Sequence, residues 1–70
     1  MKNKVKFYRT QANMTQVELA KLVNVSSRTI ISIETEKYNP SLLLAYRIAE
    51  VFHISIEELY CLKENLKLED

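Results

Sequence analysis

Four residues between positions 27 and 32 carry the chemistry that stands out in this sequence: Ser27, Arg28, Ile31 and Ser32. A guanidinium group can donate two parallel hydrogen bonds to O6 and N7 of guanine, and an apolar side chain can contact the methyl group of thymine. Arg28 therefore predicts a contact with a base. The alternative is a contact with a phosphate, which would position the protein on the DNA but would not contribute to sequence specificity. Ile31 predicts a thymine contact, with a shallow contact inside the fold as the alternative.

These side chains need a helix to present them, and the apolar spacing around them predicts two helices. Leu19 and Val23 are four residues apart, and Ile30 and Ile33 are three apart, so each pair lies on one face of a helix. Val25 falls in the short connection between them. Two such helices over residues 16–35 form a helix-turn-helix, whose second helix, about residues 27–35 here, enters the major groove of double-stranded DNA.

Local signals mark where the helices begin and end. Thr15 and Glu18, three residues apart, form a capping box. Serines are expected to cap three further helices, at Ser26, Ser41 and Ser55. The chain has no glycine, so Asn13 and Asn24 are expected to take the left-handed conformation that ends a helix. The inner face of the helix after Ser41 is expected to contain Leu42, Ala45, Ile48, Ala49 and Phe52.

The longer pattern resembles the Cro/CI-type, or XRE-like, helix-turn-helix family of transcriptional regulators. Four segments carry the resemblance: TQVELA at 15–20, VSSRTIISIE at 25–34, KYNPSL at 37–42 and ISIEEL at 54–59. The resemblance implies an all-α fold, a compact five-helix bundle of the lambda-repressor-like type, that dimerises on a palindromic operator. Some small members of the family also pair two short terminal strands, here residues 1–4 and the tail, and the alternatives for the tail are a frayed helix or disorder. Glu36 departs from the family pattern, which often has glycine there.

The resemblance also assigns roles to individual residues. The family residue that matches Gln16 bonds a phosphate and braces the second helix of the motif. The family residues that match Arg9 and Glu34 form a structural ion pair between the first helix and the end of the third.

Further DNA contacts are expected around the recognition helix. Thr15 and Gln16 lie at a helix N-terminus, where free N–H groups favour a phosphate. The loop residues Lys37, Tyr38 and Asn39 are expected to contact the DNA backbone on the other side of the groove. Hydroxyl contacts are also possible from Ser26, if it is not fully used as a cap, and from Thr29.

Composition limits the class of protein. Seventy residues allow one domain over 1–70, with a core of about 4–62 and a tail of 63–70. One cysteine and one histidine provide no internal disulfide and no four-ligand zinc site, and we expect no cofactor. A cytoplasmic protein without a membrane span or a signal peptide is expected. The absence of a nucleophile–base pair and of a glycine-rich phosphate loop argues against an enzyme.

Charge is divided unevenly along the chain. Residues 1–40 carry seven basic and three acidic side chains, a net charge of +4, and residues 41–70 carry three basic and six acidic side chains, a net charge of −3. This division is consistent with one face for phosphate, and equally with a mixed solvated surface.

The sequence thus predicts sequence-specific binding of double-stranded DNA by a homodimeric transcriptional regulator, with repression favoured. Two modules related by a two-fold axis would read two half-sites. The dimer surface is expected from the last helix and the tail, at Leu59, Leu62 and Leu66. The alternative is a protein-interaction module or antitoxin-like partner protein, with DNA binding secondary and a second regulatory protein as its partner. The apolar surplus at Leu43 and Leu44 gives this alternative weak support.

Overall fold

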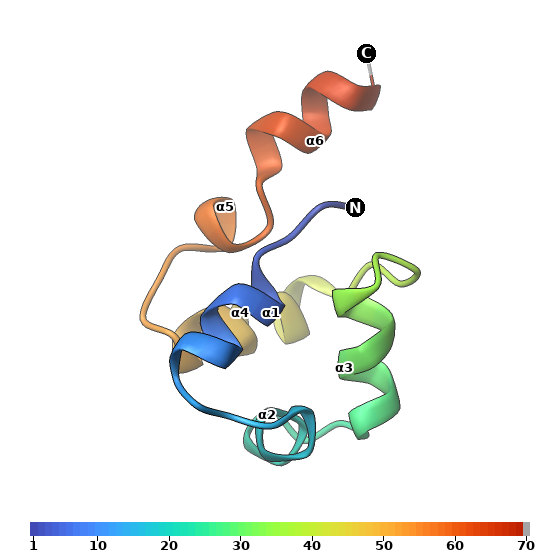
Figure 1. Ribbon diagram of the computed structural model, residues 1–70. Helices are drawn as coiled ribbons and strands as arrows, with labels where there is room; N and C mark the ends of the chain where they lie inside the picture. Colours follow the sequence, from blue (N-terminus) through green and yellow to red (C-terminus); the bar gives the residue numbers. More distant parts are fainter. Residues whose placement is uncertain (70) are drawn as a thin grey trace.

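The computed structural model describes residues 1–69 and contains six helices (Figure 1). They are α1 (Val5–Gln11), α2 (Gln16–Leu22), α3 (Ser27–Glu34), α4 (Leu42–Val51), α5 (Ile56–Leu59) and α6 (Leu62–Glu69). The all-helical prediction is confirmed, but the count of five is corrected to six, because the tail forms a helix of its own. Residues 1–69 contain no strand, so the predicted terminal strand pair is not seen there. Asp70, the last residue of the predicted tail, lies outside the described residues.

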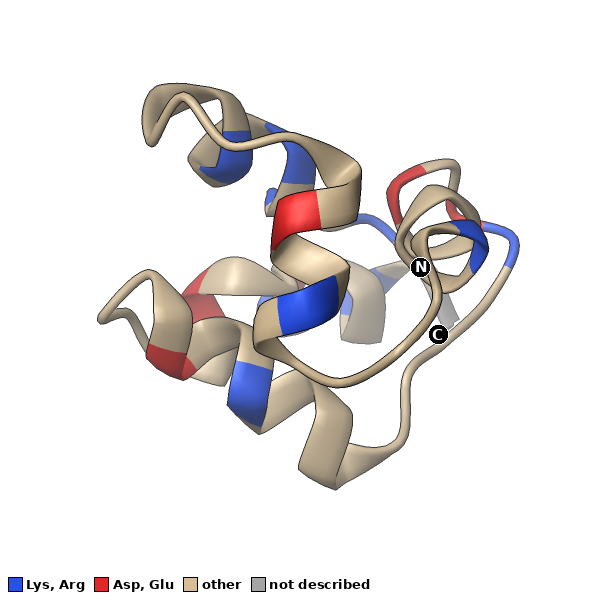
Figure 2. Ribbon diagram, turned by 90° about the horizontal axis from the view of Figure 1, so that it is seen from below, with Lys and Arg blue, Asp and Glu red and all other residues tan. Residues whose placement is uncertain are grey.

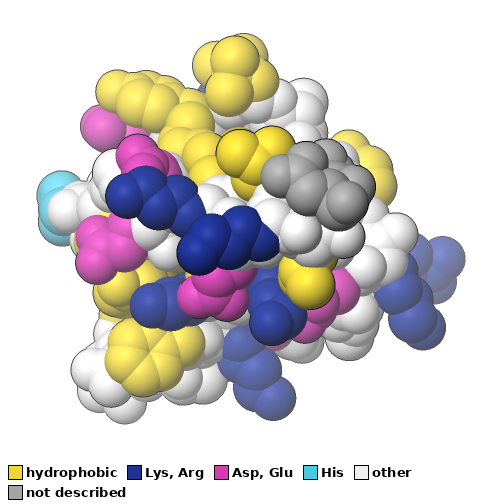
Figure 3. All heavy atoms as spheres, turned by 90° about the horizontal axis from the view of Figure 1, so that it is seen from above, with side chains coloured by type: hydrophobic (Ala, Val, Ile, Leu, Met, Phe, Trp, Pro, Cys, Tyr) yellow, Lys and Arg dark blue, Asp and Glu magenta, His cyan; other side chains and the backbone are white. Residues whose placement is uncertain are grey.

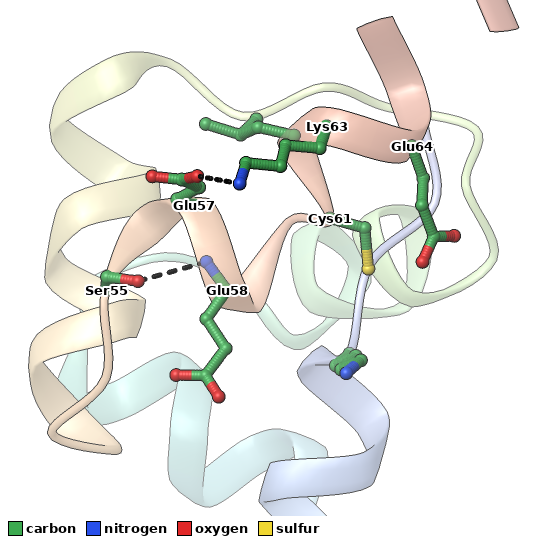
Figure 4. Close-up of a pocket in the computed structure, with 8 residues that line it drawn as sticks. Ser55, Glu57, Glu58, Cys61, Lys63 and Glu64 are labelled. Atoms are coloured by element: carbon green, nitrogen blue, oxygen red, sulfur yellow. Dashed lines mark hydrogen bonds and ion pairs between the residues drawn. The ribbon is translucent and has the colours of Figure 1, made fainter. Parts of the chain in front are cut away.

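The predicted helix starts are present. Thr15 Oγ1 accepts from the Glu18 N–H at 3.0 Å, and Glu18 Oε1 accepts from the Thr15 N–H at 2.9 Å, which completes the capping box of α2. Serine hydroxyls cap the later helices, at Ser26 for α3, Ser41 for α4 and Ser55 for α5. Figure 4 shows the last of these, in which Ser55 Oγ accepts from the Glu58 N–H at 3.0 Å. Each cap uses an N–H group that has no partner inside its own helix.

Five helix ends turn through a left-handed residue, and none of the five is glycine. Their φ angles lie between 51° and 63°, at Asn13, Asn24, Glu36, His53 and Cys61. In four cases the next N–H donates to the carbonyl five residues earlier, as Val25 N–H does to Ala20 O at 3.0 Å. This is the bond that closes a Schellman motif. The predictions for Asn13 and Asn24 are confirmed, whereas nothing in the sequence marked His53 and Cys61.

The helices enclose one apolar core. Its fully buried members are Val5, Leu19, Val23, Ile30, Ile33, Ile48, Leu59 and Tyr60. The prediction for α4 was wrong at its first residue, because Leu42 is 78% exposed while Leu44 lies inside. Leu44, Ala45, Ile48 and Ala49 recur at the three- and four-residue spacing of one helix face, and Leu42, the first residue of α4, lies at the edge of that stripe.

The N-terminal segment is tied to α6 by one side chain where the strand pair was expected. The Lys2 N–H donates to Asn65 Oδ1 at 2.9 Å, and Asn65 Nδ2 donates to Lys2 O at 2.9 Å. A side-chain amide thus replaces the backbone partner that a second strand would supply. The same Nδ2 donates to Tyr60 O at 2.6 Å, which attaches α6 to the end of α5.

Candidate nucleic-acid interface

The two faces of α3 have opposite environments. Ile30 and Ile33 are fully buried against the core, and they fix the inner face of the helix. On the other side Arg28 is exposed and Ile31 is 43% exposed. Ser27 and Ser32 are half-buried. The structure therefore places all four sequence-predicted residues of this helix away from its fully buried positions.

The first turn of α3 is held by two hydroxyls. Ser26 Oγ accepts from the Thr29 N–H at 3.3 Å and lies 3.1 Å from Thr29 Oγ1. Both hydroxyls are engaged in the cap, but the contact between them uses only one of the two O–H groups, so the other hydroxyl can still donate. Ser26 and Thr29 therefore act first as positioning residues for the N-terminal end of α3.

An ion pair links α3 to α1. Arg9 Nε lies 2.6 Å from Glu34 Oε2, and Arg9 Nη2 donates to Glu34 Oε1 at 3.2 Å, so the contact is bidentate. The two side chains are only 10% and 3% exposed. Arg9 Nη1 also donates to Met14 O at 2.8 Å, in the connection between α1 and α2. A pair this deeply buried fixes the orientation of the elements it joins.

Gln16 joins the same network from the start of α2. Its Nε2 donates to Glu34 Oε1 at 3.0 Å, so one carboxylate receives donors from α1 and from α2. An amide nitrogen carries two N–H groups, and the second remains available for a ligand at the surface. Glu34, near the C-terminal end of α3, is thus the point at which three helices are held together.

A further brace was not foreseen from the sequence. Asn3 Nδ2 donates to Ile33 O at 2.9 Å, which ties the N-terminal segment to the backbone of α3. A single asparagine before a predicted helix gives no signal for a contact 30 residues away. The nearest clue was its position two residues before the start of α1, where its Oδ1 accepts from the Val5 N–H at 3.1 Å.

The loop after α3 borders a shallow hollow beside the recognition helix. The hollow has a volume of about 240 Å³, and its lining is Ser26, Arg28, Thr29, Ser32 and Tyr38. Lys37 and Asn39 are exposed, and Tyr38 is 46% exposed. The structure thus brings Tyr38 together with the side chains of α3, and the hollow offers hydroxyl and guanidinium donors of the kind that phosphate oxygens accept.

The remaining features of the site are Thr15 and the distribution of charged residues over the helices. Thr15 is exposed, and its hydroxyl oxygen is used by the capping box. In the view from below, basic and acidic residues are interspersed over the helices (Figure 2).

The residues predicted for a dimer surface fall into two environments. Leu59 is fully buried in the core, so its side chain offers no surface to a second copy, and this corrects its assignment. Leu62 and Leu66, on α6, are 40% and 63% exposed. Of the three predicted residues, Leu62 and Leu66 are therefore the ones available for such a contact.

Comparison with known proteins identifies the family to which this chain belongs. A family model described as helix-turn-helix matches residues 5–59. A protein of Methanocaldococcus jannaschii, named as an uncharacterised HTH-type transcriptional regulator, is 49% identical over 65 residues, covering 93% of this chain and 98% of that protein. The chain belongs to the XRE-like helix-turn-helix family of regulators. The resemblance inferred from the sequence motifs is thereby confirmed.

Other organisms have relatives that are also named as uncharacterised HTH-type transcriptional regulators. One from Archaeoglobus fulgidus is 50% identical over 64 residues, with 91% of this chain and 90% of that protein covered. One from Bacillus subtilis is 41% identical over 64 residues, with 91% and 97% covered. The family consists of DNA-binding proteins without enzymatic activity, so the expectation that the chain is not an enzyme is confirmed.

Two further observations concern the described residues alone. No helix among them is long and apolar enough to cross a membrane. Within the same part of the chain, His, Cys, Asp and Glu do not gather in groups of three that could hold a metal ion.

Proposed function

We propose that this protein is a sequence-specific DNA-binding transcriptional regulator that acts as a homodimer on a palindromic operator, most simply as a repressor. The observation that carries the proposal is the division of α3 into a buried face, Ile30 and Ile33, and an outer face with Arg28 and Ile31 exposed. The family membership supports DNA binding in general. A role on DNA also fits the cytoplasmic location expected from the sequence.

In this proposal α3 lies in the major groove. Arg28 donates to O6 and N7 of a guanine, and a bidentate pair of this kind contributes about 1–3 kcal/mol of discrimination against other bases. Ile31 contacts the methyl group of a thymine, which gives an exposed β-branched side chain an apolar partner. Ser27 and Ser32 hydrogen-bond base edges or the neighbouring backbone.

The surrounding residues hold the DNA backbone. Gln16 donates its second N–H to a phosphate while the first stays on Glu34, so the contact with DNA is coupled to the position of α3. Thr15 contacts the same strand. Lys37, Tyr38 and Asn39 contact the backbone on the other side of the groove, with Tyr38 at the hollow beside Arg28. Ser26 and Thr29 position α3 and add hydroxyl contacts.

Two copies are needed for operator affinity. One module of this size buries too little surface on DNA, whereas two modules related by a two-fold axis read half-sites about 34 Å apart. The exposed leucines of α6, Leu62 and Leu66, supply the dimer contact.

A second candidate function is a protein-interaction module, or an antitoxin-like partner of another protein. It is favoured by the exposed α4 residues Leu42 and Leu43, which are 78% and 61% exposed. A salt titration separates the two functions. Phosphate engagement makes the affinity for DNA fall steeply with salt concentration, and a docking module whose DNA binding is secondary shows no such slope.

Selection of bound sites from random duplex DNA tests the proposal. We expect a palindromic consensus with half-site centres about 10 base pairs apart. Arg28→Ala serves as the matched variant, because it changes an exposed side chain that lies outside the core. Recovery of unrelated sequences with both proteins would contradict the proposal.

A further inference from the structure

The outer side of α4 forms one wall of an apolar hollow. The hollow has a volume of about 470 Å³, and its lining consists of Leu42, Leu43, Tyr46 and Ile56 from α4 and α5. Leu42, Leu43 and Tyr46 are 78%, 61% and 51% exposed. Seen from above, hydrophobic side chains reach the surface in several places, many of them toward the upper edge of the view (Figure 3). Contiguous apolar surface of this kind marks a contact site.

A second apolar surface lies on α6. Leu62 and Leu66 are four residues apart and therefore lie on one side of this helix, where they are 40% and 63% exposed. Figure 1 shows that α6 extends away from the bundle formed by the other helices. Its principal helix contact is with α5. The α6 leucines are thus without a covering helix among the described residues.

We propose that in the homodimer α6 of each copy lies in the α4–α5 hollow of the other copy. The inference rests on the proposed function only for the existence of a dimer. In a dimer with two-fold symmetry this contact occurs twice: α6 of the first copy lies in the hollow of the second, and α6 of the second copy lies in the hollow of the first. One operation therefore covers both exposed apolar surfaces of both copies.

The spacing of the two surfaces is compatible. Leu42 and Tyr46 are one helical turn apart on α4, and Leu62 and Leu66 are one turn apart on α6. Four residues rise by about 6 Å in an α-helix, so the two rows have equal length. Rows of residues four apart on one helix fit into the grooves between such rows on another.

Charges at the rim favour the same occupant. Glu50 lies one helical turn beyond Tyr46 on α4, and its carboxylate raises the pKa of the tyrosine. Tyr46 lines the hollow, so Glu50 lies at its rim, whereas Glu57 lines a different hollow. Lys63 of α6 already lies 4.0 Å from Glu57 in its own chain (Figure 4). Lys67 has no ion pair among the described residues, and in the exchanged position it faces an acidic rim.

Sedimentation of the full chain tests the exchange. We expect the unmodified protein to be dimeric, and Leu43→Glu and Leu66→Glu each to weaken the dimer at least about tenfold, because each places a charge in an apolar contact. Leu22→Glu is the matched control, since Leu22 on α2 is 61% exposed, as Leu43 is. A monomeric unmodified protein, or a Leu43→Glu variant that is folded and still fully dimeric, would overturn the proposal.

Cross-linking separates the exchange from other dimers. Leu43→Cys and Leu66→Cys are made separately, each with Cys61→Ser. After oxidation, we expect a disulfide-linked dimer from the mixture of the two variants. Efficient cross-linking of either variant alone would show that like faces meet, and it would overturn the exchange. The absence of any link in a mixture that sediments as a dimer would also overturn it.

The DNA-binding proposal can fail separately from this one. Arg28→Ala should lose operator binding and remain dimeric, whereas Leu43→Glu should lose the tight binding of a full palindrome and keep binding to a half-site at low salt. A dimeric protein with the 43–66 link but no affinity for DNA would disprove the regulator function and leave the exchange standing. A heterologous protein that binds the hollow of a chain found to be monomeric on its own would instead identify the hollow as that protein's docking site and overturn the proposal.

Discussion

At the scale of single residues, Glu34 has the most connected position near the proposed interface. Its carboxylate receives Arg9 from α1 and Gln16 from α2 while it belongs to α3. The family resemblance implied the pair with Arg9 and a bracing role for Gln16. The resemblance did not imply that Gln16 and Arg9 would share one carboxylate, because such sharing depends on how three helices meet.

Replacing Arg9 tests whether this pair is structural. Arg9→Ala leaves the Glu34 charge buried without its partner, and breaking a buried pair in this way costs about 3–5 kcal/mol. We expect a lower melting temperature together with a lower affinity for DNA, measured by thermal denaturation and by titration. A double variant, Arg9→Met with Glu34→Leu, should recover much of the stability. Lost affinity at an unchanged melting temperature would instead make Arg9 a direct DNA ligand.

The hydroxyl group of Tyr60 is buried without a hydrogen-bond partner among the described residues. The residue is 1% exposed. Burial accordingly raises the pKa of Tyr60 above its ordinary value. An unpaired buried hydroxyl costs about 1–3 kcal/mol. Tyr60→Phe is expected to stabilise the fold by about 1 kcal/mol in chemical denaturation, and a loss of stability would show that the hydroxyl has a partner.

At the scale of helices, the starts and the ends differ in how well the sequence predicted them. The caps at Thr15, Ser26, Ser41 and Ser55 were predictable because each is a bond between residues three apart. The left-handed ends at His53 and Cys61 were not, since neither residue type prefers that conformation and the surrounding packing imposes it. The exposure of Leu42 and the burial of Leu44 also depend on how α4 is rotated against the core.

The capping box of α2 gives a pH-dependent contribution. Its hydrogen bonds with Thr15, the backbone bond most of all, lower the pKa of Glu18 below its ordinary value of 4.5. A lowered pKa stabilises the fold above the unfolded-state pKa and loses that effect as the pH falls through the folded-state value. Glu18→Ala should therefore lower the melting temperature at pH 7 and have little effect near pH 3.

Glu18→Gln is the control for this prediction. Its amide oxygen can accept from the Thr15 N–H at either pH, so the difference between Glu18→Gln and Glu18→Ala should be similar at both pH values. If the effect of Glu18→Ala were as large at pH 3 as at pH 7, the carboxylate would not be its source.

Asn65 makes the hydrogen bonds that attach α6 to the N-terminal segment, beside an exposed ion pair between Lys2 and Glu64 at 3.9 Å. Asn65→Ala removes the bonds to Lys2 and to Tyr60 O, and we expect a loss of about 1–2 kcal/mol in chemical denaturation. The Lys2 amide hydrogen should also exchange faster with solvent. Asn65→Asp keeps the acceptor and loses the donor, so it should have an intermediate effect on Lys2 exchange. Unchanged exchange in Asn65→Ala would show that other contacts hold the segment.

At the scale of the whole molecule, the sequence predicted a single core with a helix-turn-helix in it, because apolar spacing and caps act locally and agree with each other. It did not predict how the chain termini meet. The sixth helix and the clasp of Lys2 by Asn65 join residues 63 positions apart, and no local pattern signals such a contact. The residues of the proposed interface could be predicted from the sequence, because the apolar positions of a helix identify its buried face and the remaining positions then form its outer face.

The proposed role as a regulator requires that side chains on the outer face of α3 distinguish base pairs. The most direct measurement is the affinity of the unmodified protein and of Arg28→Ala for a selected operator and for all its single base-pair variants. We expect the unmodified protein to prefer guanine at one position in each half-site, and Arg28→Ala to lose about 1–3 kcal/mol of discrimination there alone. A uniform loss of affinity at every position, or no loss, would contradict the claim that Arg28 reads sequence.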